Sequence, residues 1–150
     1  MVNAEVLQKL DIFEGLTAPE LDAVTEIADV ASFPKGAIVF KENEEAGKLY
    51  VLLEGKVAIQ FEVGRHLEAV VHTVTAGQAF GWSALVQPYQ FTASARCMED
   101  SKLVTVDREG LRRLLDLDCH IGFIIMEKLA ELVSGRLRET RIQLISMIHG

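Results

Sequence analysis

The chain has 150 residues, of which 49% are hydrophobic, and carries a formal net charge of −7. This length suits one domain of ordinary size with a substantial core that needs no disulfide. The acidic balance argues against direct contact with nucleic acid. Charges interrupt every apolar run well short of the ~20 residues of a membrane span, and the first residues lack a signal-peptide pattern. We therefore expect a cytoplasmic protein that uses neither a membrane nor nucleic acid as a direct partner.

The cysteines and histidines predict no metal site. Cys97 and Cys119 lie far apart with no Cys-x-x-Cys pair, and no two histidines have the i, i+4 spacing of helical metal ligands. A metal enzyme of the cupin type would need several histidine and carboxylate ligands on strands, where only His66 and His72 are available. We therefore expect no metal and no enzymatic activity.

Residues 1–30 are predicted to form helices. Val6, Leu7 and Leu10 recur at helical spacing. The segment Thr17-Ala18-Pro19-Glu20 combines an N-cap threonine, a proline in the first turn and an acid at the third helical position. Together these features predict an N-terminal helical segment.

Residues 31–106 change to a period of two, which is typical of strands. β-branched-rich segments alternate with turn signals that contain glycine or proline. The predicted strands cover 37–40, 49–53, 57–61, 67–74, 91–97 and 102–106. We expect about seven or eight short strands in all, of which these six can be placed. Their spacing predicts an antiparallel jelly roll or sandwich, so the fold class is mainly β with flanking α.

Residues 107–150 are predicted to be helical again. Asp107 caps a short helix over 108–115, and a longer one follows over 118–148. We expect a single domain over 1–150, with no DNA-binding domain in the chain.

The segment between the predicted strands carries the strongest functional signal. Phe80-Gly81-Trp82-Ser83-Ala84-Leu85 is followed by Phe91-Thr92-Ala93-Ser94-Ala95. A glycine turn that leads into a short helix directs unpaired N–H groups and a helix dipole at one place, which predicts an anion site.

This segment resembles the phosphate-binding cassette of cyclic nucleotide-binding domains, in which Phe-Gly-Glu-Leu-Ala-Leu is followed by Arg-Thr/Ala-Ala-Thr/Ser. Residues 12–21 and 48–57 resemble that family's N-terminal helical segment and central hairpin. The resemblance implies a double-stranded β-helix (jelly roll) like the sensor domains of the catabolite activator protein group, with cyclic AMP or cyclic GMP as ligand. The residues that the cassette assigns to the ligand are Phe80, Gly81, Trp82, Ser83, Ala84, Phe91, Thr92, Ala93 and Ser94.

Two positions of the cassette depart from the family pattern. Trp82 stands where the family has a ribose-binding Glu, and Phe91 stands where it has a phosphate-pairing Arg. We therefore expect weak or absent cyclic nucleotide binding. The two rings either line an apolar pocket or fill and close it, and of the two we favour closure. Arg96 is interpreted as an exposed strand arginine rather than a substitute cation.

The long C-terminal helix carries two heptad positions that predict a homodimer interface. The predicted interface residues are Phe123, Met126, Ala130, Val133, Leu137, Thr140, Leu144 and Met147. The alternative is that this helix packs on its own jelly roll, and the resemblance implies both contacts along its length. Arg136, Arg138 and Arg141 are interpreted as a solvated helix face.

These observations favour a non-enzymatic ligand-sensing or regulatory module that forms a homodimer. Its output would go to a partner protein that the sequence does not name. The alternative function is a structural dimerisation or protein-interaction module whose pocket no longer binds a ligand.

Overall fold

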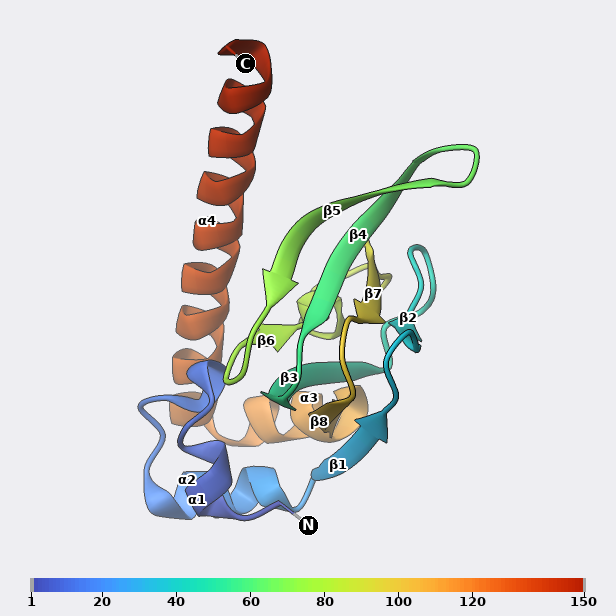
Figure 1. Ribbon diagram of the computed structural model, residues 1–150. Helices are drawn as coiled ribbons and strands as arrows, with labels where there is room; N and C mark the ends of the chain where they lie inside the picture. Colours follow the sequence, from blue (N-terminus) through green and yellow to red (C-terminus); the bar gives the residue numbers. More distant parts are fainter. Residues whose placement is uncertain (1, 150) are drawn as a thin grey trace.

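The computed structural model describes residues 2–149, and its N-terminal part is helical (Figure 1). The elements of this part are α1 (Ala4–Leu7), the 3-10 helix η1 (Asp11–Phe13) and α2 (Ala18–Thr25). Thr17 caps α2: its hydroxyl accepts from the Glu20 amide at 3.4 Å, and the Glu20 carboxylate accepts from the Thr17 amide at 2.8 Å. The predicted capping residues are confirmed.

Two four-stranded antiparallel sheets follow the helical part. One sheet has the order β1-β8-β3-β6, with bounds Ala28–Phe33, Ser101–Asp107, Lys48–Glu54 and Ala79–Phe80. The other has the order β2-β7-β4-β5, with bounds Ile38–Phe40, Ser94–Cys97, Val57–Gly64 and Leu67–Val74. Neighbours in each sheet are mostly distant in sequence, as a jelly roll requires. The predicted mainly β jelly roll with flanking helices is therefore confirmed.

The inner faces of the two sheets enclose the core. Both faces of the first sheet are buried: Val51 and Val104 are fully buried on one face, and Leu52 and Leu103 on the other, whereas Val57 is fully buried on the second sheet. Because successive residues of a strand point to opposite faces, one face of the first sheet packs toward the second sheet and the other lies under the helices.

Three strands differ from the prediction. β1 (Ala28–Phe33) was not predicted, and its first residues correct the expectation that residues 1–30 are helical, because α2 ends at Thr25. β6 was not predicted, because two residues are too short to show a period. β7 begins at Ser94 rather than at residue 91, because Phe91 pairs with a loop instead of the sheet ladder: its amide donates to Glu44 and its carbonyl accepts from Asn43. The segment before β7 is therefore free to line a pocket.

Two helices complete the chain, α3 (Arg108–Leu117) and α4 (Cys119–His149). The Asp107 carboxylate caps α3 by accepting from the Gly110 amide at 2.8 Å, as predicted. The first turns of α4 pack on the rest of the chain through buried Ile121, Ile125 and Leu129, and its later turns extend beyond the sheets (Figure 1). Among residues 2–149, no helix combines the length and the apolar character needed to cross a membrane.

The packing of the β3–β4 turn against residues 100–101 can be tested by substituting its glycine, Gly55. Gly55 has φ +104°, and a Cβ there would overlap the Ser101 hydroxyl and lie 2.7 Å from the Asp100 carbonyl. Gly36 has φ +88° but open space around it. Gly36→Ala should therefore cost only the backbone strain of about 1–3 kcal/mol, whereas Gly55→Ala adds a clash with the backbone.

Urea unfolding of both variants measures this difference. We expect a clearly lower midpoint for Gly55→Ala than for Gly36→Ala. Equal midpoints would show that the β3–β4 turn does not pack against residues 100–101 as described.

Candidate functional site

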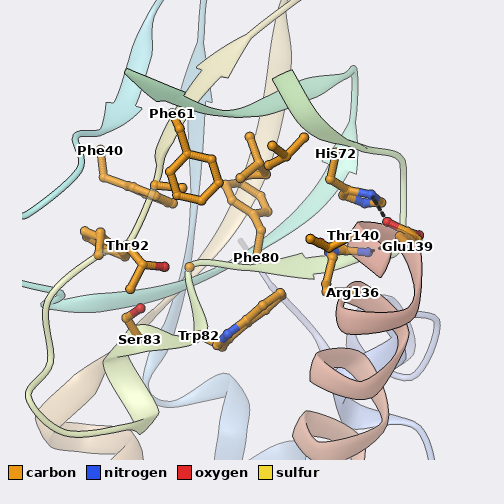
Figure 2. A pocket seen from close by; sticks show the side chains of 15 residues that line it. Phe40, Phe61, His72, Phe80, Trp82, Ser83, Thr92, Arg136, Glu139 and Thr140 are labelled. Carbon is orange, nitrogen blue, oxygen red and sulfur yellow. Dashed lines mark hydrogen bonds and ion pairs between the residues drawn. The ribbon is translucent and has the colours of Figure 1, made fainter. Parts of the chain in front are cut away.

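A pocket of about 160 Å³ lies between the cassette segment, the sheet that contains β4 and β5, and helix α4 (Figure 2). It opens to solvent on one side. Its lining residues are Phe40, Ile59, Phe61, Val71, His72, Phe80, Gly81, Trp82, Ser83, Phe91, Thr92, Ala93, Arg136, Glu139 and Thr140. The pocket therefore joins segments that are far apart in the sequence.

Stacked aromatic rings form one side of this pocket. The rings of Phe40 and Phe91 lie 3.7 Å apart and almost parallel, and Phe80 lies 6.0 Å from Phe40. Gly81 adopts a left-handed conformation beside them, where a Cβ would come within 3.0 Å of Phe40 and 3.1 Å of Tyr50. Only glycine lets the cassette turn pass this close to the rings.

The cassette turn offers less to an anion than the sequence predicted. η2 (Trp82–Leu85) is a four-residue 3-10 helix, so its dipole is small. The Ala84 amide donates to Gly81 within the turn at 3.4 Å. Of the predicted ligand residues, Ala84 is buried away from the pocket and Ser94 accepts a hydrogen bond from the Glu42 amide, so neither lines it. The other seven predicted residues line the pocket.

Trp82 and Phe91 differ in what they do to the pocket. Phe91 is only 4% exposed and fills space within the aromatic stack. Trp82 is partly exposed and lines a cavity that stays open. The favoured expectation that both rings close the pocket is therefore wrong, since only Phe91 fills part of it.

The pocket contains a cation that the sequence analysis missed. Arg136 was assigned to a solvated face of α4, yet its side chain is only 19% exposed and lines the pocket. Its guanidinium lies 5.6 Å from the centre of the Trp82 ring, within cation–π range. Burial lowers the pKa of Arg136 from its usual value, and nearby Glu139 and Asp11 oppose that shift. Arg96, in contrast, is exposed and does not line the pocket, as expected.

A polar contact holds α4 to β5 at the edge of the pocket. His72 Nδ1 lies 2.8 Å from Glu139 Oε2, and the Gln143 side chain donates to the Val71 carbonyl at 3.2 Å. Because a carboxylate only accepts, Nδ1 of His72 carries the hydrogen. The middle of α4 is therefore linked directly to a strand that lines the pocket.

The predicted interface residues of α4 divide into two groups. Phe123, Met126, Ala130, Val133, Leu137, Leu144 and Met147 are exposed on the isolated chain. Thr140 is also exposed and borders the pocket. The apolar residues Ile142, Ile145 and Ile148 are also exposed on the last turns of α4. No cluster of three or more potential metal ligands occurs within residues 2–149.

Comparison with known proteins gives one consistent family. A family model described as cyclic nucleotide-binding domain matches residues 30–118. The chain superposes with a TM-score of 0.82 on a crystal structure described as that of a cyclic nucleotide-binding protein from Geobacter metallireducens GS-15. That protein is 33% identical, and the match covers 91% of this chain and 99% of the other.

Curated relatives are longer than this chain. The CRP-like cAMP-activated global transcriptional regulator of Mycobacterium tuberculosis is 28% identical over 144 residues, which cover 96% of this chain and 62% of that protein. The Cyclic AMP receptor protein of Thermus thermophilus is 29% identical over 137 residues, which cover 89% of this chain and 60% of that protein. With the jelly roll and the cassette pocket in place, these matches establish that the chain belongs to the cyclic nucleotide-binding domain family and is a regulatory domain of that kind.

Proposed function

We propose that the chain is a non-enzymatic regulatory domain that senses a small ligand in the cassette pocket and binds cyclic AMP or cyclic GMP weakly or not at all. The observation that carries this proposal is that α4 forms part of the pocket wall. Arg136, Glu139 and Thr140 face the cavity from this helix. A ligand there contacts the helix that would transmit the signal.

Ligand binding would be transmitted if the ligand makes better contacts with α4 in one position of the helix than in another. A ligand that touches the cassette, β5 and α4 together stabilises one arrangement over another. The His72–Glu139 contact already joins α4 to β5, so a ligand beside it strengthens or replaces that link. The exposed apolar turns beyond residue 140 would carry the displacement to a second chain or to a partner protein.

Cyclic AMP is named in the descriptions of both curated relatives, so its binding is the first to be considered for this chain. Trp82 and Phe91 offer no carboxylate for a ribose hydroxyl and no cation for a phosphate. The loss of a charge-assisted hydrogen bond alone costs about 1.5–3 kcal/mol, or roughly ten- to a hundredfold in affinity. Arg136 lies on the helical side of the pocket, across from Phe40 (Figure 2), and Phe91 stacks on the Phe40 ring.

The double substitution Trp82→Glu plus Phe91→Arg tests the proposed specificity. It restores the two family side chains, so calorimetry should show cyclic AMP binding at least about tenfold tighter than in the native chain. The matched control, Trp82→Leu plus Phe91→Met, removes the same rings without adding polar groups and should show no gain.

Circular dichroism must first show that the restored variant folds, because Arg at position 91 replaces a buried ring. Micromolar or tighter cyclic AMP binding by the native chain would contradict the proposal. So would a folded double variant whose affinity is no better than that of the Leu/Met control.

The proposal includes a homodimer formed through α4. Leu137 and Leu144 are 61% and 56% exposed on the isolated chain. They share one heptad position with Phe123, which is also exposed. Apolar side chains at heptad spacing are buried when two helices associate. The last turns are apolar around much of their circumference, since Ile142 and Ile145 are also exposed. Such a surface is typical of helices that are covered in an assembly.

Leu137→Asp plus Leu144→Asp tests this interface. Both side chains are exposed on the isolated chain, so the substitutions should leave the fold intact while placing unpaired carboxylates in the interface. Sedimentation equilibrium should show a dimer for the native chain and a monomer for the variant. Ser134→Asp plus Arg138→Asp, at exposed positions outside the two heptad rows, should remain dimeric. A dimeric Leu variant would place the interface elsewhere.

The alternative function, a dimerisation module with a dead pocket, has less support. A cavity remains beside the cassette, and it contains charged groups rather than a packed apolar core. The transcriptional role named for one relative belongs to a protein of which this chain covers 62%. For this acidic domain we propose no direct nucleic-acid contact, a cytoplasmic location and output through the dimer or an unidentified partner protein.

A further inference from the structure

The cassette pocket has an aromatic side and a cationic side that face each other (Figure 2). Phe40, Phe61 and Phe80 lie on the aromatic side, and Arg136 and His72 lie across the cavity near α4. A ligand that fits both sides must have an apolar, ring-shaped body and a polar group at one end.

Two buried polar atoms of this pocket have no hydrogen-bond partner within residues 2–149. They are Arg136 Nη2 and His72 Nε2. Buried polar atoms are nearly always hydrogen-bonded, so each such atom calls for an explanation. Both side chains line the same cavity. A ligand with polar atoms there would supply the missing partners.

The charge on Arg136 is only partly compensated inside the protein. Its Nη1 lies 3.8 Å from Glu139 Oε1, which is longer than a hydrogen bond. The Glu139 carboxylate makes its closer contact, at 2.8 Å, with His72 Nδ1. The guanidinium therefore keeps Nη2 as a charged donor, and an anionic oxygen is the acceptor that binds it most strongly. His72 Nε2 adds a second polar contact, as an acceptor in the neutral ring and as a donor in the protonated ring.

The enclosed part of the pocket has room for an apolar body of about one ring. A cavity of about 160 Å³ is close to the engineered apolar cavity of ~150 Å³ that binds benzene in another protein. A purine joined to a ribose and a cyclic phosphate is larger than this space and would extend through the open side of the pocket. A single aromatic ring fills it and leaves a substituent at the polar side.

We propose that the pocket binds a monocarboxylate with a single aromatic ring, with the ring between the aromatic side chains and the carboxylate on Arg136. This proposal rests on the proposed ligand-sensing function and names the chemical class of its ligand. Recognition has two parts: the carboxylate accepts a charge-assisted hydrogen bond from Arg136 Nη2, and the ring displaces water from Phe40, Phe61 and Trp82.

Trp82 makes the test specific, because it is the one tryptophan of the chain and it lines the pocket. Benzoate titrated into the native protein, with excitation at the red edge of indole absorption, should give a saturable change in Trp82 emission. Benzamide and benzyl alcohol keep the ring without the charge, and acetate and inorganic phosphate keep a charge without the ring. Each of these four probes should need at least about tenfold higher concentration than benzoate, because each loses one of the two parts of recognition.

Arg136→Met keeps the length and apolar stem of the side chain and removes its charge. It should weaken benzoate binding at least about tenfold and benzamide binding much less, because a neutral amide oxygen accepts a weaker hydrogen bond than a carboxylate does. Arg138→Met is the matched control on the exposed face of α4 and should bind benzoate like the native chain. Equal affinity for benzoate and benzamide in the native chain, or full benzoate affinity in folded Arg136→Met, would overturn the proposal. The comparison of probes on the native chain decides the matter even if Arg136→Met does not fold.

The outcomes also separate this proposal from the function on which it rests. If benzoate gives no change but a cyclic nucleotide or another metabolite does, the ligand class is wrong and ligand sensing stands. If no compound of a metabolite panel changes Trp82 emission or raises the melting temperature, ligand sensing fails as well.

Discussion

The site depends on one constraint, the register in which α4 lies against the rest of the chain. Ile121, Ile125 and Leu129 are buried and fix the rotation of the helix over its first turns. The same face continues at helical spacing to Arg136 and Glu139, since residues three and four apart lie on one side of a helix. The stripe is apolar where the helix covers η1 and α3, and charged where it passes the pocket. A different rotation would direct Arg136 into solvent and leave the pocket without its cation.

This stripe explains why the sequence predicted the fold better than the site. The capping residues of α2 and α3 and the alternation of the strands are local patterns, and the structure contains them. Arg136 has no local pattern that separates it from the arginines beside it. Its burial is set by the contact of α4 with a cassette that lies much earlier in the chain. A signal was nevertheless present, because the spacing from Ile125 and Leu129 through Leu132 leads to residue 136 on the same face.

The cassette shows the opposite outcome. The sequence identified the motif, but it predicted a stronger anion site than the turn provides. Gly81 forms the expected turn, in a left-handed conformation, yet the helix that follows is a single 3-10 turn. The replacement of a charged side chain by Phe91 was visible in the sequence. Its consequence was not, because the stacking of Phe91 on Phe40 depends on a strand from a distant part of the chain. The aromatic stack places apolar rings where the sequence had predicted a phosphate site.

The two cysteines of the chain lie in opposite environments. Cys97 is buried at the end of β7, and burial raises the pKa of its thiol. Cys119 is exposed at the first residue of α4. Because the reactive species is the thiolate and access is required, a thiol reagent would modify Cys119 far faster than Cys97. The native chain thus carries a selective attachment point for a spectroscopic label at the base of α4, the helix through which we propose that ligand binding is transmitted.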